Sequence, residues 1–326
     1  MDGFTKSPAP EGAARPRIGV SACLLGEQVR FDGGHARDTF VAESLGSFVS
    51  WVQVCPEMEA GLGTPREPIR LLAHPGGIRV VSTRTRRDFT SELHDVATRR
   101  AAVLATQDLD GFVLKKDSPS CGLHRVRVYK DDGTATRDGR GVFAAALTKA
   151  LPLLPVEEEG RLVDPGIREH FLERVFAHQR LRALGEPDGV HAIMRFHTRH
   201  KLLLLAHSPA LYRAMGSLVA MARPPQLGEL MRTYRASFMS ALAAPATRSR
   251  HVNVLQHIAG YFKRSVSDQA RREIAAAIAD YQRELVPLVV PVTLLGHYAR
   301  VHAVDYLLGQ VYLDPHPRAL KLRNHA

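Results

Sequence analysis

The chain has 326 residues, of which 45% are hydrophobic and 24% charged, with a formal net charge of +11. These values are close to globular averages and exclude collagen-like, coiled-coil and largely disordered proteins. No apolar run reaches the roughly 18 residues of a membrane span, and the first residues lack the apolar core of a secretory signal. Three cysteines, sparse and odd in number, argue against a disulfide scaffold. We therefore expect a soluble, cytoplasmic protein of about two domains that makes no membrane contact.

After an expected disordered tail at residues 1–16, residues 17–152 alternate short apolar runs with helix-like stretches. This alternation predicts an α/β domain with a mostly parallel sheet. The expected strands are 17–22, 48–54, 78–82, 111–115 and 125–129. The expected helices are 39–45, 91–107 and 141–149, and Asp131-Asp132-Gly133 predicts a hairpin turn after the last strand.

Prolines 152 and 155 and the acidic run 157–159 predict a domain boundary, so we expect a linker at 153–189 with a connecting helix at 165–184. Residues 190–326 show helical spacing almost throughout and predict an all-helical domain. Ser208-Pro209 is typical of a helix start. The expected helices are 190–207, 209–222, 227–243, 250–263, 267–285 and 292–310.

The second half of the chain carries most of the excess positive charge. Residues 151–326 hold 23 lysines and arginines, 15 acidic residues and 12 of the 16 histidines. A basic excess attracts nucleic acid, so contact of this domain with RNA or DNA is one interpretation. The basic residues are scattered at helical spacing, however, as on a solvated helix face. His197 and His200 could share a helix face as metal ligands, but histidines packed against aromatic rings are more common.

Each cysteine follows an expected strand. Cys23 comes after 17–22, Cys55 after 48–54, and Cys121 a few residues after 111–115. The carboxyl ends of parallel strands share one edge of a sheet, which is where ligands bind, so we expect the three thiols to meet there. A free cysteine is often only a small buried hydrophobe, but two of these three lie in turn-like sequences, Cys-Pro-Glu and Ser-Pro-Ser-Cys-Gly.

Three thiolates fit two kinds of metal site. Zinc would take a fourth protein ligand, for which His35, His74 and His124 are available, or a water molecule. An iron–sulfur cluster usually takes four thiolates, so three would leave one iron with an open position. The spacing does not choose between zinc and iron.

Residues 17–150 resemble the bacterial 2-thiouracil desulfurase family in three ordered motifs. The first is Ser-Ala-Cys-Leu-Leu-Gly at 21–26 with Val-Arg-Phe-Asp-Gly-Gly at 29–34; the second is Cys-Pro-Glu at 55–57 with Gly-Leu-Gly-Thr-Pro-Arg at 61–66; the third is Lys116 with Ser-Pro-Ser-Cys-Gly at 118–122. The resemblance implies a 4Fe-4S cluster held by Cys23, Cys55 and Cys121, with the fourth iron free.

Residues 190–326 resemble the helical YbgA-like domain, which is of unknown function and is often fused behind this family. The motifs that carry this resemblance are Phe196-His197, His200-Lys201, the stretch 253–261 and the ending 312–324.

The resemblance implies a desulfurase that acts on a thiolated pyrimidine such as 2-thiouracil. A soft thiocarbonyl sulfur suits iron, and water would then attack the carbon without a redox change, releasing sulfide. Glu57 is the expected base, although an acidic residue in a first helical turn is also favoured by the helix dipole. Ser118 and Ser120 could bind the ring or relay a proton, or could simply form the turn around Pro119.

Two other functions stay open. One is a nucleic-acid-binding or damage-response accessory protein with a structural cluster, and the other is a zinc-binding sulfur carrier. A free thiolated base and a thiolated tRNA position present the same reacting atoms, so the sequence does not choose between these substrates.

Overall fold

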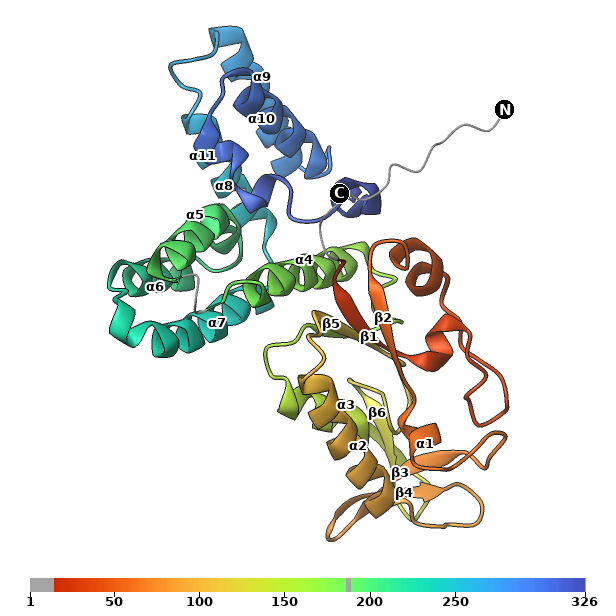
Figure 1. The fold of residues 1–326 in the computed structure, drawn as a ribbon. Coiled ribbons are helices and arrows are strands. Elements are labelled where there is room, and N and C mark those ends of the chain that lie inside the picture. The colour runs from red at the N-terminus through yellow and green to blue at the C-terminus, as the bar shows by residue number, and fades with distance from the viewer. Residues whose placement is uncertain (1–14, 186–188, 326) are drawn as a thin grey trace. The chain divides into compact units, whose positions relative to one another are not determined.

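The computed structural model describes residues 15–185 and 189–325, in two units that divide between Phe171 and Leu172 (Figure 1). The expected tail at 1–16 lies outside the described residues except for its last two. The first unit is α/β and the second is helical, which confirms the expected fold class. None of the helices in the described ranges is both long and apolar enough to cross a membrane.

The first sheet has the strand order β2-β1-β5-β8, and all its neighbours are parallel. Its strands are β1 (Arg17–Ser21), β2 (Ser50–Val54), β5 (Gly111–Leu114) and β8 (Val156–Glu158). Every residue of β5 is buried, as expected for a central strand covered on both faces. Gly19 of β1 lies against Phe112 of β5, and a Cβ atom on Gly19 would come within 2.2 Å of the Phe112 ring.

A second sheet, which the sequence did not separate from the first, has the order β4-β3-β6-β7. Its strands are β3 (Ile69–His74), β4 (Gly77–Ser82), β6 (Val126–Tyr129) and β7 (Ala135–Gly139). The central pair β3 and β6 is parallel and the outer pairs are antiparallel. The predicted hairpin at 131–133 joins β6 to β7. Strand β3 was missed because its sequence, Ile-Arg-Leu-Leu-Ala-His, lacks both strict alternation and β-branched enrichment.

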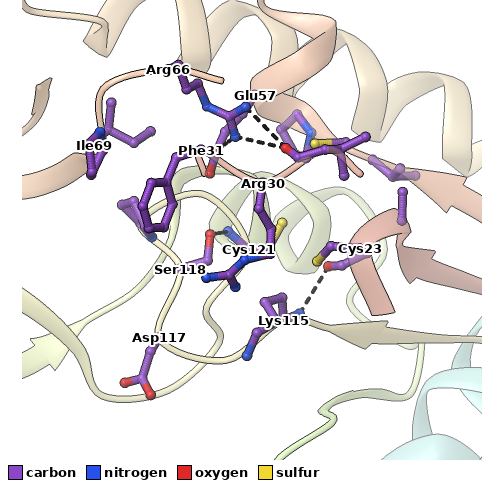
Figure 2. Close-up of a pocket in the computed structure, with 18 of the residues that line it drawn as sticks. Cys23, Arg30, Phe31, Glu57, Arg66, Ile69, Lys115, Asp117, Ser118 and Cys121 are labelled. Atoms are coloured by element: carbon purple, nitrogen blue, oxygen red, sulfur yellow. Dashed lines mark hydrogen bonds and ion pairs between the residues drawn. The ribbon is translucent and has the colours of Figure 1, made fainter. Parts of the chain in front are cut away.

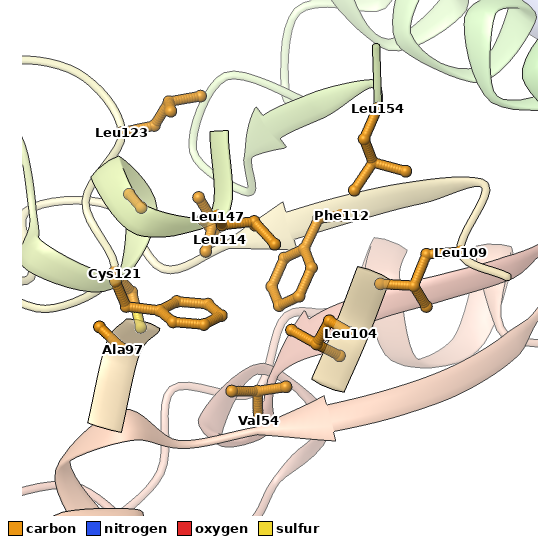
Figure 3. Packing of buried hydrophobic residues seen from close by; sticks show 12 residues of the cluster. Val54, Ala97, Leu104, Leu109, Phe112, Leu114, Cys121, Leu123, Leu147 and Leu154 are labelled. Atoms are coloured by element: carbon orange, nitrogen blue, oxygen red, sulfur yellow. The ribbon is translucent and has the colours of Figure 1, made fainter. Parts of the chain in front are cut away.

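Two long helices of the first unit, α2 (Thr90–Ala105) and α3 (Val142–Ala150), pack against each other and the sheets (Figure 1). The core beneath them centres on Phe112 and Phe143, whose rings meet edge to face at 5.6 Å. Cys121 belongs to the same cluster of buried side chains (Figure 3). Short helical turns at Ala22–Leu25, Phe40–Leu45 and α1 (Pro56–Glu59) follow or precede the strands of the first sheet.

The division between the units falls within α4 (Pro165–Arg182), inside the range 153–189 expected as a linker with a connecting helix. Strand β8, at the start of this range, pairs with β5 and belongs to the first unit. The other long helices of the second unit are α5 (Gly189–His207), α6 (Pro209–Ala220), α7 (Leu227–Ala243), α8 (Arg248–Gly260), α9 (Asp268–Gln282) and α10 (Val289–Val301).

Local signals in the second unit were partly confirmed. Ser208 caps α6, accepting a hydrogen bond from the Leu211 amide at 3.3 Å. The single helix expected at 292–310 is instead two, α10 and α11 (Asp305–Leu308), because Ala303 adopts a left-handed conformation with φ +46° between them.

Candidate functional site

The three cysteines lie at the carboxyl ends of three neighbouring parallel strands. Cys23 sits in the helical turn after β1, Cys55 directly follows β2 and begins α1, and Cys121 lies in the loop after β5. Since β2, β1 and β5 are adjacent in the sheet, these ends share one edge. All three cysteines line one cavity of about 320 Å³ (Figure 2). The expected meeting of the three segments is thus confirmed.

The thiols are withdrawn from water. Cys23 and Cys121 are buried and Cys55 is half-buried. Burial raises the pKa of Cys23 to about 11, with nearby Cys55 adding to the effect, and raises the pKa of Cys121 well above its ordinary value. Burial also raises the pKa of Cys55. Thiolates at these positions therefore need a cation for stability, and this is what a thiolate-bound metal centre provides.

Two cationic side chains lie beside the thiols. Arg30 and Lys115 both line the cavity (Figure 2), and both oppose the rise in the pKa of Cys23. Lys115 forms an ion pair with the buried carboxylate of Glu159, whose other oxygen accepts a hydrogen bond from the Lys116 amide at 2.8 Å. Lys115 was not singled out from the sequence, since a lysine after a strand usually points into solvent.

Glu57 projects from the first turn of α1 into the cavity wall. One carboxylate oxygen is paired with Arg66, and the other accepts a hydrogen bond from the Ser120 hydroxyl at 2.8 Å. Arg66 is itself fixed by donating to the carbonyl oxygens of Gly63 (2.6 Å) and Val29 (3.1 Å). Both sequence interpretations of Glu57 fit this position, because it faces the cavity and also stands at a helix start.

The two serines differ in their placement. Ser118 lines the cavity, and its hydroxyl oxygen accepts hydrogen bonds from the amides of Ser120 (3.2 Å) and Cys121 (3.1 Å), which forms the turn. Ser120 is only 1% exposed and lies behind the cavity wall, where it contacts Glu57. Gly141 lets α3 approach this loop closely, since a Cβ there would lie 2.4 Å from the Ser120 carbonyl oxygen.

Two buried carboxylates, Glu158 at the end of β8 and Glu159 directly after it, hold the loop that carries Cys121. Glu158 accepts hydrogen bonds from the amides of Leu123 (2.7 Å) and His124 (3.1 Å), while Glu159 holds the start of the loop through Lys115 and Lys116. The sequence interpretation took this acidic run as a boundary. Three consecutive glutamates look alike in sequence, so no sequence signal could have shown that Glu158 and Glu159 are buried and hold this loop.

The remaining candidates near the first motif serve the loop. Arg30 lines the cavity, whereas Asp32 accepts a hydrogen bond from the Gly34 amide at 3.0 Å and shapes the turn. None of the three histidines considered as a fourth zinc ligand lines the cavity. Within residues 15–185 and 189–325, no three histidine, cysteine or acidic side chains are arranged to hold a single metal ion.

His197 and His200 of the second unit are packed among aromatic rings, as the commoner interpretation expected. His200 stacks on Phe196 with ring centroids 4.0 Å apart, and its Nδ1 contacts the Phe196 carbonyl oxygen at 2.7 Å. His197 contacts the Tyr234 hydroxyl at 3.2 Å. Burial lowers the pKa of His197 to about 4 and that of His200 to about 3. These imidazoles hold helices together as neutral groups.

Two known families match separate parts of the chain. Residues 18–159 match the 2-thiouracil desulfurase family, and residues 201–317 match a family described as a protein of unknown function, DUF1722. The first match covers the cavity and all three cysteines, and the second covers most of the helical unit.

Two bacterial proteins and one solved structure are similar to parts of the chain. The uncharacterized protein YbgA of Escherichia coli (strain K12) is 36% identical over 155 residues, which are 47% of this chain and 92% of YbgA. The uncharacterized protein YbbK of Bacillus subtilis (strain 168) is 30% identical over 136 residues, 40% of this chain and 89% of YbbK. The solved structure, a 4Fe-4S-dependent thiouracil desulfidase named TudS, is 31% identical. It covers 46% of this chain and 94% of its own, with a TM-score of 0.38.

Proposed function

The chain belongs to the 2-thiouracil desulfurase family through residues 18–159 and to DUF1722 through residues 201–317, and from this we propose that its first unit removes sulfur from a thiolated pyrimidine such as 2-thiouracil. The observation that carries the proposal is the cavity at the sheet edge, into which three neighbouring parallel strands each bring one cysteine. Its volume of about 320 Å³ suits a small ligand, since small-molecule sites start at roughly 300 Å³.

Cys23, Cys55 and Cys121 are the residues that would hold a 4Fe-4S cluster. They fit it because thiolates at two buried positions and one half-buried position need a cationic partner, and because three thiolates leave the fourth iron open. When bound, the cluster supplies an iron that takes a soft sulfur ligand and acts as a Lewis acid. Such a centre and three free cysteines suit the reducing cytoplasm, where we place the protein.

The reaction is a hydrolysis without electron transfer. Water adds its oxygen to the thiocarbonyl carbon, the carbon–sulfur bond breaks, and the products are the carbonyl compound and sulfide. Glu57 accepts the proton of the attacking water on its carboxylate. Arg66 fixes the direction of that carboxylate, and Ser120 donates a hydrogen bond to the oxygen that faces away from Arg66.

Other side chains of the cavity orient the ring. Phe31 lines the cavity, is 38% exposed and offers an aromatic face for stacking. In both of its hydrogen bonds with described residues, the Ser118 hydroxyl oxygen is the acceptor, so the hydroxyl proton has no acceptor among those residues. It is therefore available to donate to the carbonyl oxygen of the pyrimidine.

Metal analysis of the anaerobically purified protein tests the proposal. We expect iron and acid-labile sulfide, a brown colour and turnover of 2-thiouracil, and we expect Cys23→Ser, Cys55→Ser and Cys121→Ser each to lose the turnover and part or all of the iron. A colourless protein without iron after anaerobic reconstitution, or one that binds zinc alone, contradicts the proposal.

The role of Glu57 has a matched control in the same short helix. Glu57→Gln should lower 2-thiouracil turnover by about a hundredfold or more, the usual size of a general-base effect, while the iron content stays that of the unmutated protein. Glu59→Gln should change neither, since Glu59 pairs at 3.5 Å with Arg100 and does not line the cavity. Equal turnover in both variants would remove Glu57 from the mechanism.

A further inference from the structure

The second unit contains a cavity of its own, of about 250 Å³, formed by α10, α11 and the last turns of the chain. All the residues that line it lie between positions 289 and 324, so it is separate from the cysteine site. None of the three motifs that the sequence singled out in the first unit contributes to it. The cavity therefore needs an explanation that desulfuration does not supply.

The side chains that line this cavity carry an excess of positive charge. Four cationic side chains line it against a single carboxylate, that of Asp314; the cations are Arg300, Arg318, Lys321 and Arg323. Side chains of like charge converge on a small space only at an electrostatic cost, which an anion would remove. Complementarity therefore points to a negatively charged ligand.

Two of the cations already have protein partners. Arg323 is buried and donates to the Tyr312 carbonyl oxygen at 2.6 Å and to Glu173 at 3.0 Å, which fixes the end of the chain. Arg318 pairs with Asp314 at 3.4 Å in an exposed contact. Arg300 and Lys321 make no ion pair with any described residue, so their charges are available to a ligand.

The backbone places these two charges at the cavity. Arg300 lies one turn after Gly296 on α10, and its guanidinium nitrogen comes within 3.7 Å of the position a Cβ would take on Gly296. Lys321 has φ +52°, a left-handed conformation that is uncommon outside glycine, and it turns the chain between two short helical turns that both border the cavity.

The rest of the wall is mostly apolar. Val292 of α10, Leu308 of α11 and Leu313 face the same space as the two cations. A bare inorganic ion would leave this surface without a partner. A ligand that joins an anionic group to an apolar or planar body would cover it and add hydrophobic contact.

We propose that this cavity binds a small organic anion, with its phosphate or carboxylate group held by Arg300 and Lys321 and its apolar body against Val292, Leu308 and Leu313. Phosphate and carboxylate share the chemistry that arginine and lysine recognise. The cavity gives the second unit a binding role that is independent of the reaction in the first unit.

Four small probes test the proposal by calorimetric titration of the full-length protein. Phenyl phosphate and benzoate have the same apolar body with different anionic groups, phenol has the body without the charge, and inorganic phosphate has the charge without the body. We expect one of the first two to bind at least about tenfold more tightly than phenol and inorganic phosphate, and the better one identifies the anionic group. Equal binding of all four, or none by either aromatic anion, overturns the proposal.

Variants separate a specific site from general surface charge. Arg300→Gln and Lys321→Gly should each weaken binding of the better probe by roughly tenfold or more, the effect of one lost charge-assisted hydrogen bond. Lys321→Gly also suits the left-handed backbone, so its loss of binding cannot be attributed to unfolding. Arg272→Gln, which removes an exposed charge of α9 outside the cavity, should leave binding unchanged. Equal losses in all three variants would show general charge attraction only and overturn the proposal.

Discussion

The two units use buried polar side chains in opposite ways. Around the cysteine cavity, the buried carboxylates of Glu158 and Glu159 hold a loop in place from an adjacent strand, leaving its thiol and hydroxyl groups facing an open space. In the second unit, buried polar groups contact one another and close the gaps between helices, as His207 and Glu173 do at 2.5 Å. Burial alone therefore does not mark a functional site. A functional site is marked instead by polar groups that line an open cavity.

The largest expected effect concerns the buried pair in the helical unit. Burial by itself would raise the pKa of Glu173, but its contacts with His207 and Arg323 outweigh this and hold the pKa well below its usual range. Glu173→Gln removes the carboxylate charge that the buried side chains of Arg323 and His207 contact. We expect a loss of about 3–5 kcal/mol in the free energy of unfolding, measured by urea denaturation.

The control for this change is Glu273→Gln, which removes an exposed carboxylate of α9 and should alter the free energy of unfolding by less than about 0.5 kcal/mol. If the comparison between the units holds, the folded fraction of the Glu173→Gln protein should still carry its iron. A normal stability for Glu173→Gln would show that the pair makes no net contribution.

A smaller effect on stability is expected at the cavity, with a larger one on the metal. Glu158→Ala leaves the Leu123 and His124 amides without their acceptor, which should cost about 2–3 kcal/mol. Because these amides follow Cys121, we also expect iron to be lost to a chelator about 10–100-fold faster, as when groups that orient metal ligands are removed.

The neighbouring Glu157 provides a matched control. Its carboxylate pairs at 2.8 Å with Arg161, which is half exposed, and accepts a hydrogen bond from the Glu158 amide at 2.9 Å; no hydrogen bond among the described residues joins it to the amides after Cys121. Glu157→Ala should therefore leave the rate of iron loss unchanged. Equal rates of iron loss from the Glu157→Ala and Glu158→Ala proteins would show that the Glu158 carboxylate does not position the cysteine loop.

The same contrast explains how far the sequence could be interpreted. The meeting of Cys23, Cys55 and Cys121 was predictable, because strand ends and parallel pairing follow from local apolar runs and a general rule of sheet topology. The caps and most helix bounds of the second unit were also predictable, since they depend on neighbouring residues alone.

What the sequence did not show depends on contacts between distant residues. Glu57, Arg66 and Ser120 form one network only after α1 and the cysteine loop are brought together. The acidic run 157–159 predicted a boundary, whereas Glu158 and Glu159 are buried by partners some 40 positions earlier in the chain. No local pattern distinguishes such carboxylates from solvated ones.

The smallest expected effect is a change in how stability depends on pH. An unfolded histidine has a pKa of about 6.5, whereas burial lowers the pKa of His200 to about 3, with Arg180 and Arg199 adding to it. The unfolded chain therefore binds more protons as the pH falls below about 6.5, and stability decreases. Each such histidine contributes up to about 1.4 kcal/mol per pH unit.

His200→Phe should remove one such contribution between about pH 6.5 and 5.5, a range above that in which an unfolded glutamate such as Glu173 becomes protonated. An aromatic ring fits the position, because His200 stacks on Phe196 and meets Phe238 edge to face at 5.3 Å. Phe238→Leu disturbs the same cluster without removing a titrating group, so it should lower the free energy of unfolding while keeping the slope against pH. An unchanged slope in His200→Phe would mean that His200 binds the same number of protons in the folded and unfolded protein over this range. The packing of neutral histidines would then not be what distinguishes the helical unit.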